Sequence, residues 1–301
     1  MKNLIKTIKV GNTPLVELKK IKAKYSLKGN IFAKVESFNP AGSVKDRPAY
    51  EMFLDAINKG GITKDTTLIE PTSGNTGIAI AYIARELGLR CILTMPETMS
   101  VQRRQILASY GAELELTPGS EGMKGAIRRA NELLKDIPNS IILGQFDNPA
   151  NPLAHYKTTG PEIYSQLNGK VDVFIAGVGT GGTLSGAGKY LKEKTNVKVL
   201  AIEPATSAVL SGKQPGKHGI QGIGPGFIPN TLDTKIYDGI RLVETDEAIE
   251  KAREVRDIEG LSVGISAGAA LAAAIKEASL DENLDKNIVI IFPDGGDRYS
   301  L

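Results

Sequence analysis

The run Thr67-Leu68-Ile69-Glu70-Pro71-Thr72-Ser73-Gly74-Asn75-Thr76-Gly77 decides the fold of this 301-residue chain. It begins as a short apolar strand, turns through small polar residues and glycine, and enters a helix expected to reach Leu87. Strands joined by helices of this length form right-handed crossovers, so the pattern predicts a parallel sheet covered on both faces. In the first half of the chain we expect strands at 30–36, 67–70, 91–95, 113–116 and 140–143, and helices at 50–59, 75–87, 101–110 and 123–135.

An Asn- and Pro-rich segment at 145–152 interrupts the alternation, which then resumes. We therefore predict an α/β protein of two stacked three-layer domains with mainly parallel sheets, and a ligand in the cleft between them. The predicted domains are residues 1–148 and 149–301, and the first strands, residues 1–38, are free to pack on the second domain. Later strands are expected at 171–176, 197–202 and 287–292. Later helices are expected after the glycine loop as far as residue 194, at 246–259 and at 268–278.

The composition argues against several classes of function. Lys and Arg number 37 against 34 Asp and Glu, and the chain has no tryptophan, which argues against nucleic-acid binding. Lysines interrupt the apolar pairs of residues 1–10, and no run of 18 apolar residues occurs, so we expect a soluble, cytoplasmic protein. The single cysteine (Cys91) and the two histidines (His155 and His218) argue against a disulfide and against a metal site.

The stretch Asn39-Pro40-Ala41-Gly42-Ser43-Val44-Lys45-Asp46-Arg47 contains a candidate catalytic lysine. Ser43 is a suitable N-cap for a following helix, which puts Lys45 in the first helical turn. The positive end of a helix lowers the pKa of a lysine, as an amine that attacks a carbonyl group requires. Taken alone, the stretch favours the simpler interpretation of a solvated lysine beside Asp46 and Arg47.

Three glycine-containing turns follow predicted strands, where ligands bind to parallel sheets. In the first, residues 71–77, hydroxyls and backbone N–H groups at a helix N-terminus suit a carboxylate or phosphate. The alternative is an ordinary helix cap formed by Thr72 or Ser73, although a cap does not need so many small polar residues.

The second turn, Gly177-Val178-Gly179-Thr180-Gly181-Gly182-Thr183, satisfies G-x-G-x-x-G, and Glu203 closes the next strand. These features are typical of nicotinamide-dinucleotide binding. Hydroxyls at a helix N-terminus equally suit one terminal phosphate.

The third turn, Gly264-Ile265-Ser266-Ala267-Gly268, matches the nucleophile elbow of hydrolases. A hydrolase triad needs its histidine after the serine, and both histidines here precede Ser266. We therefore expect Ser266 to present its hydroxyl to a ligand rather than to act as a nucleophile.

These motifs together resemble the cysteine synthase (O-acetylserine sulfhydrylase) family of fold-type II pyridoxal-phosphate enzymes. Further matching stretches extend along the whole chain, at residues 11–15, 95–100, 103–104, 145–146, 155–156, 159–163 and 220–224. The resemblance implies that Lys45 holds pyridoxal 5'-phosphate as a Schiff base and that Asn75 bonds the ring hydroxyl. It implies that Gly179, Thr180, Gly181, Gly182 and Thr183 bind the phosphate, and that Ser266 faces the pyridine nitrogen. It further assigns Thr72, Ser73, Thr76, Gln145 and Gly222 to the substrate.

The implied reaction is a β-replacement that makes L-cysteine from O-acetyl-L-serine and sulfide through an α-aminoacrylate. Lys45 would act as general base once the substrate has displaced it. The resemblance also implies a homodimer, with serine acetyltransferase as a candidate partner. Three alternatives stay open: a cystathionine β-synthase, a cysteine-cleaving lyase that produces hydrogen sulfide, and a nicotinamide-dependent oxidoreductase.

Overall fold

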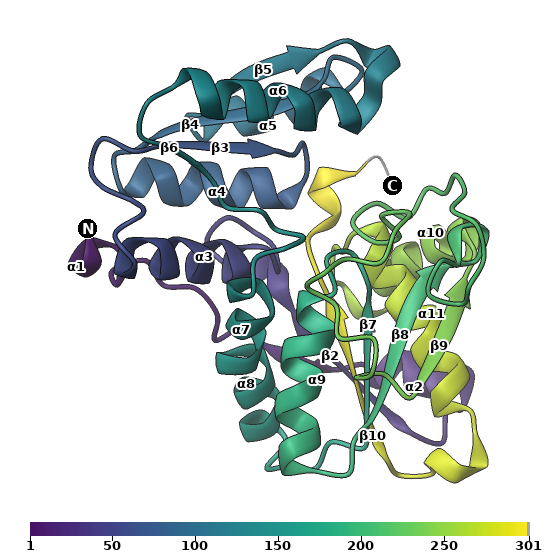
Figure 1. Cartoon of the computed structure of the whole chain (residues 1–301). Coiled ribbons are helices and arrows are strands. Elements are labelled where there is room, and N and C mark those ends of the chain that lie inside the picture. The colour runs from purple at the N-terminus through teal and green to yellow at the C-terminus, as the bar shows by residue number, and fades with distance from the viewer. Residues whose placement is uncertain (300–301) are drawn as a thin grey trace. The chain divides into compact units, whose positions relative to one another are not determined.

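The computed structural model describes residues 1–299, which divide into two compact units. The first unit contains Met1–Val10 and Lys45–Asn151. The second unit contains Gly11–Val44 and the described chain from Pro152 onward. Each unit is built around one β-sheet (Figure 1).

The sheet of the first unit has four parallel strands in the order β5-β4-β3-β6. The strands are β3 (Thr67–Pro71), β4 (Arg90–Pro96), β5 (Glu113–Thr117) and β6 (Ser140–Ile142). The helices are α1 (Lys2–Ile5), α3 (Asp46–Asn58), α4 (Asn75–Glu86), α5 (Val101–Ser109) and α6 (Gly122–Asp136), with a 3-10 turn at Gly119–Glu121. Helix α7 (Ala150–Lys157) begins at the end of this unit.

Helices cover both faces of this sheet. Helix α6 packs on all four strands, and α4 packs on β3 and β4 from the other face (Figure 1). Strand β4 is buried from Cys91 to Pro96 without alternation, because neither of its faces meets water. The predicted parallel, doubly covered sheet is confirmed here.

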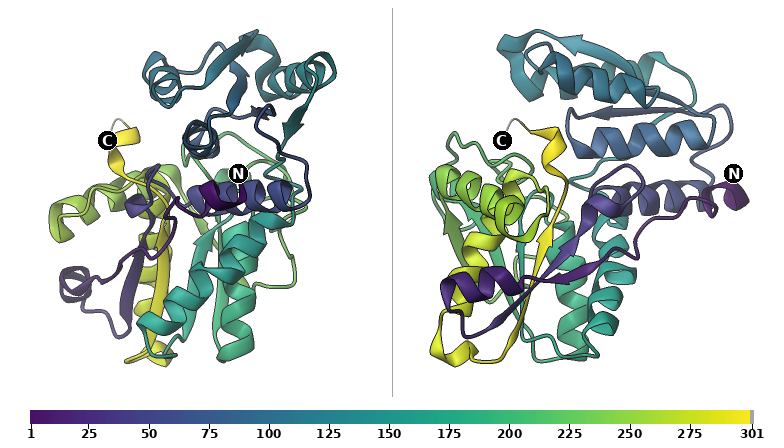
Figure 2. Two further views of the ribbon diagram at one scale, coloured as in Figure 1. Left: turned by 90° about the vertical axis from the view of Figure 1, so that its left-hand side faces the viewer. Right: turned by 180° about the vertical axis from the view of Figure 1, so that it is seen from behind.

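The sheet of the second unit has six strands in the order β1-β2-β10-β7-β8-β9. They are β1 (Leu15–Glu17), β2 (Asn30–Val35), β7 (Val173–Gly177), β8 (Lys198–Pro204), β9 (Gly239–Val243) and β10 (Asn287–Phe292). Only β1 is antiparallel to its neighbour among these strands of the described chain. Figure 2 shows β2 alongside β10, and the two strands pair over their full length although they lie far apart in the sequence.

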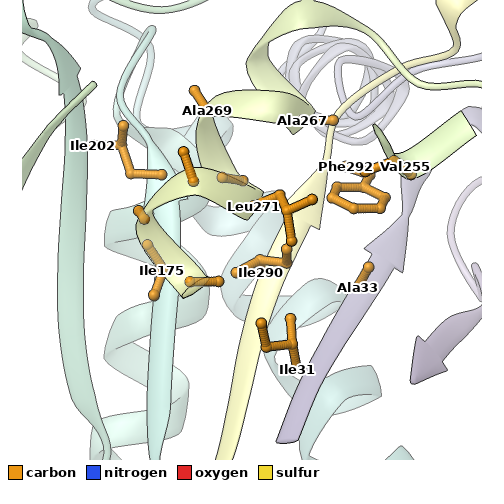
Figure 3. Close-up of a cluster of buried hydrophobic side chains, with 14 of the residues drawn as sticks. Ile31, Ala33, Ile175, Ile202, Val255, Ala267, Ala269, Leu271, Ile290 and Phe292 are labelled. Atoms are coloured by element: carbon orange, nitrogen blue, oxygen red, sulfur yellow. The ribbon is translucent and has the colours of Figure 1, made fainter. Parts of the chain in front are cut away.

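Alternate side chains of this sheet enter two separate cores. Ile288 and Ile290 of β10 pack toward α11 (Ile265–Ala278), where Leu271 lies over the strands (Figure 3). Val289 and Ile291 point to the opposite face and join the core that also includes residues of α8 (Thr159–Gln166) and α9 (Gly182–Lys194). Helices α2 (Lys19–Tyr25) and α10 (Thr245–Glu254) complete the unit. This two-unit, mainly parallel arrangement agrees with the predicted fold class.

Several elements differ from the sequence prediction. The sequence did not predict helices α2 and α8 or the strand β9. Helix α2 buries only Ile21, and β9 has no continuous apolar run, so both lack a clear hydrophobic signal. The helix predicted at 246–259 is regular only to Glu254 and continues as a π-helix, Val255–Glu259, which ends at Gly260 with φ +76°. The helix predicted from residue 268 begins at Ile265. In the described part of the chain, no helix combines the length and apolar character needed to cross a bilayer.

Candidate active site

The predicted cofactor lysine lies at the start of α3. The helix begins at Asp46, and the Ala49 N–H donates to the Lys45 carbonyl at 3.1 Å, so Lys45 occupies the N-cap position. Ser43 is therefore not the N-cap, contrary to the prediction. It forms a β-bridge with Asp294, and this extended pairing keeps it outside the helix.

Lys45 has the lowered pKa that was predicted, but for a different reason. Desolvation by burial lowers the pKa of its amine from 10.5 to about 8, although the residue as a whole keeps some exposed surface. The prediction had assigned this effect to the helix dipole. Asp46 and Arg47 are 1% and 2% exposed, so the interpretation of a solvated, charged surface cluster is wrong.

The turn between β3 and α4 does not use its hydroxyls to cap the helix. The N-cap is Gly74, with φ −98° and no side-chain capping bond, so neither Thr72 nor Ser73 fills that role. The Thr72 hydroxyl accepts the Gly74 N–H at 3.3 Å instead. A Cβ built at Gly74 has no neighbour within 4 Å, which leaves space beside the helix N-terminus. A helix N-terminus attracts negative charge, so this space suits a carboxylate.

Gln145 lies beside this turn. The Thr76 hydroxyl donates to Gln145 Oε1 at 2.6 Å, and Asn151 Nδ2 donates to the Gln145 carbonyl at 2.8 Å. The structure thus brings together two of the residues predicted to hold a substrate carboxylate, from segments about 70 residues apart.

In the second unit, the glycine loop after β7 leads directly into α9. The N-cap is Gly181, with φ +82°, and α9 runs for 13 residues from Gly182. A Cβ at Gly179 would overlap the carbonyl oxygen of Gly222, and one at Gly181 would overlap Leu232. The Thr231 hydroxyl donates to the Thr180 carbonyl at 2.6 Å. The backbone is therefore held in one conformation with a helix N-terminus behind it, which suits a phosphate group.

Glu203 does not fit the nicotinamide interpretation of this loop. It is 2% exposed, and its carboxylate accepts the N–H groups of Leu210 and Ser211 at 2.8 and 3.0 Å. It also accepts the Ser211 hydroxyl at 2.6 Å. A carboxylate engaged in this way stabilises its own turn and does not present itself to a ribose.

The loop around Gly222 packs on the phosphate-binding candidate. Gly222, Gly224 and Gly226 all have positive φ, from +62° to +91°, where glycine is favoured. The Gly224 N–H donates to the Val178 carbonyl at 2.9 Å, and a ring nitrogen of His218 lies 2.9 Å from the Gly224 carbonyl. These contacts hold Gly222 beside Gly179.

Ser266 lies in the first turn of α11 and is 7% exposed. The flanking glycines are explained by packing: a Cβ at Gly264 would overlap Asp294, and one at Gly268 would overlap the Ala248 carbonyl of α10. Ser266 therefore lies in a regular helical turn, and its role toward a ligand stays a prediction.

The predicted site residues belong to both units. The first unit carries Lys45, Thr72, Ser73, Asn75, Thr76 and Gln145, and the second carries Gly179, Thr180, Gly181, Gly182, Thr183, Gly222 and Ser266. Sequence reasoning missed Glu70, which it treated only as the end of a strand. A charged residue inside an otherwise apolar, doubly covered strand was the signal for it.

Comparison with known proteins identifies the family. Residues 6–294 match the family model described as pyridoxal-phosphate dependent enzyme. The chain is 50% identical over 292 residues to a cysteine synthase of Staphylococcus aureus, covering 96% of this chain and 93% of that protein. The chain belongs to the cysteine synthase family of pyridoxal-phosphate dependent enzymes.

Solved structures agree. The cysteine synthase (OASS) of Entamoeba histolytica superposes with a TM-score of 0.94 at 43% identity, over 99% of this chain and 88% of that one. A hydrogen sulfide-producing enzyme of Fusobacterium nucleatum superposes with a TM-score of 0.92 at 43% identity, over 98% of each chain. The family resemblance inferred from the sequence is confirmed, and the cofactor of the family is pyridoxal phosphate rather than a nicotinamide.

Proposed function

We propose that this enzyme makes L-cysteine from O-acetyl-L-serine and sulfide, with release of acetate. The observation that carries the proposal is the desolvated amine of Lys45 at the head of α3, with a pKa of about 8. An amine that is partly neutral near pH 7 can bond a carbonyl group and can later accept a proton. The 50% identity to a cysteine synthase supports the same reaction.

In this proposal, Lys45 binds pyridoxal phosphate, Asn75 bonds its ring hydroxyl, and Ser266 faces its pyridine nitrogen. Gly179, Thr180, Gly181, Gly182 and Thr183 bind its phosphate at the N-terminus of α9. When bound, pyridoxal phosphate withdraws electrons from the α-carbon of an amino acid. Ser266 is neutral, so it does not hold a proton on the ring as a carboxylate would, and this favours loss of a β-substituent over transamination.

The substrate carboxylate binds at the N-terminus of α4, to Thr72, Ser73, Thr76 and Gln145. The helix N–H groups and the pair formed by Thr76 and Gln145 orient it. Lys45 removes the α-proton, and its lowered pKa suits that role near neutral pH. We assign Gly222 to the substrate, and the open space where a Cβ would stand is consistent with a small nucleophile.

A second candidate activity is cleavage of cysteine to hydrogen sulfide. The Fusobacterium nucleatum structure, described as a hydrogen sulfide-producing enzyme, is as similar in identity as the Entamoeba histolytica cysteine synthase. A cystathionine β-synthase is the third candidate on the same residues. We further propose a cytoplasmic homodimer, with serine acetyltransferase as a partner to be tested by co-purification.

A visible absorption spectrum tests the proposal. The purified enzyme should be yellow, change its spectrum when O-acetyl-L-serine is added, and recover when sulfide follows. Lys45→Ala should lose both the band and turnover. A yellow enzyme that ignores O-acetyl-L-serine but responds to L-cysteine favours the lyase, and better use of homocysteine than of sulfide favours the cystathionine synthase.

A further inference from the structure

Glu70 is a buried carboxylate that no step of the proposed reaction uses. It is the penultimate residue of β3 and is 2% exposed. Its Oε2 accepts the N–H groups of Leu143 and Gly144 at 3.1 and 3.2 Å, and its Oε1 accepts that of Gln145 at 3.3 Å. Three consecutive backbone N–H groups therefore converge on one side chain.

This arrangement is a backbone nest built for an anion. Gly144 has φ +74° and no neighbour within 4 Å of a Cβ built on it, so its left-handed conformation, and not crowding, requires glycine. Within residues 1–299, no cation forms an ion pair with Glu70. Because a buried carboxylate without compensation is costly, the three N–H groups are the interaction that retains it there.

Glu70 joins the two segments that carry the substrate-binding candidates. Its backbone continues through Pro71 into the turn with Thr72, while its side chain holds the turn that carries Gln145. The side chains of Gln145 and Thr76 then meet at 2.6 Å, which closes a ring of contacts from β3 through both turns to α4. Displacement of the 143–145 turn would move Gln145 relative to Thr76.

We propose that Glu70 is a positioning residue that fixes the turn of Gln145 against the turn of Thr72, and so sets the affinity for the amino-acid substrate. The inference rests on the proposed function, in which these two turns hold the substrate carboxylate. In this proposal Glu70 acts through the 143–145 turn that its carboxylate holds.

The test is Glu70→Gln assayed at pH 8.5, above the pKa of about 7 of Glu70, where the substitution keeps the shape and removes the charge. One amide oxygen cannot serve all three N–H groups, and the amide nitrogen then faces a donor. Displacement of Gln145, which removes one hydrogen bond to the charged substrate carboxylate, should raise KM for O-acetyl-L-serine roughly tenfold to a hundredfold. The expected change in kcat is less than about threefold, and the cofactor absorption band should keep its position and intensity.

Thr66→Val is the matched control. Thr66 is 1% exposed just before β3, and its hydroxyl accepts the Thr63 N–H at 2.8 Å and donates to Asn139 at 3.0 Å. The Thr66→Val variant therefore loses two hydrogen bonds to neighbouring turns, as Glu70→Gln disturbs those of the 143–145 turn, but at the opposite end of β3. This control should lower stability but leave KM unchanged.

A spectral titration separates failure of this inference from failure of the proposed function. If the wild-type enzyme does not convert O-acetyl-L-serine and sulfide, the proposed function is refuted. The affinity for L-serine or L-cysteine, which carry the same α-carboxylate, would still test the role of Glu70. Equal amino-acid affinity in wild type and Glu70→Gln would overturn the inference. If that variant does not fold, Glu70→Asp keeps the charge with a shorter reach, and unchanged affinity in Glu70→Asp would overturn it equally.

Discussion

Gly74→Ala separates the folding role of the β3–α4 turn from its binding role. Gly74 has φ −98°, which alanine adopts without strain, and a Cβ there meets no atom within 4 Å. Alanine reduces the freedom of the unfolded chain, which stabilises by about 0.4–1 kcal/mol, and it caps a helix less well than glycine by a similar amount. We therefore expect the free energy of unfolding to change by less than about 1 kcal/mol.

Substrate binding should respond much more strongly. The added methyl group occupies the space beside the N-terminus of α4 where the proposed substrate carboxylate binds. Loss of one hydrogen bond to that charged group costs about 1.5–3 kcal/mol, which corresponds to a roughly tenfold to hundredfold weaker affinity. The substitution should thus uncouple affinity from stability.

The assay is a titration of the cofactor spectrum with O-acetyl-L-serine, together with urea unfolding. Gly61→Ala is the control, since Gly61 is exposed in the same unit and a Cβ there makes only ordinary contacts of 3.5 Å or more. Unchanged affinity in Gly74→Ala would refute the location of the carboxylate site. A large loss of stability would refute the claim that this glycine is not needed for folding.

Three further predictions follow from the same structure. The rate at which cofactor-free enzyme takes up pyridoxal phosphate should rise about tenfold from pH 7 to pH 9 and then level off. The reason is that the amine of Lys45, with a pKa of about 8, becomes neutral in that range. A rate that continues to rise beyond pH 10 would contradict this. Gly179→Ala should lose about 1–3 kcal/mol of stability and release cofactor on dialysis, because its Cβ overlaps the Gly222 carbonyl, whereas Gly61→Ala should do neither. Burial raises the pKa of Glu70 from 4.5 to about 7, so the folded state binds this proton more tightly than the unfolded state. The stability of wild type relative to Glu70→Gln should therefore fall by up to about 3 kcal/mol as the pH rises from 4.5 through 7. Parallel pH profiles of urea unfolding for the two proteins would exclude the pKa shift.

The local elements near the site could be read from the sequence because their signals are local. The strands β3 and β4 appear as short apolar runs, and the glycine turns after β3 and β7 stand directly before helices, as expected. Motif spacing over the whole chain was enough to identify the family, and with it the cofactor. The lowered pKa of Lys45 was also foreseen, although its cause was misassigned.

What the sequence alone determined is therefore the kind of each element and the chemistry of each motif, since hydrophobic period and turn residues act over a few positions. The tertiary structure decided which distant segments meet. It paired β2 with β10, drew Ser43 into a bridge with Asp294 instead of a helix cap, and placed three N–H groups of the Gln145 turn on Glu70. The contact of Glu70 forms because a buried carboxylate needs hydrogen-bond donors, and its donors lie more than 70 residues away along the chain. The local spacing of apolar and polar residues does not specify which distant segment supplies them.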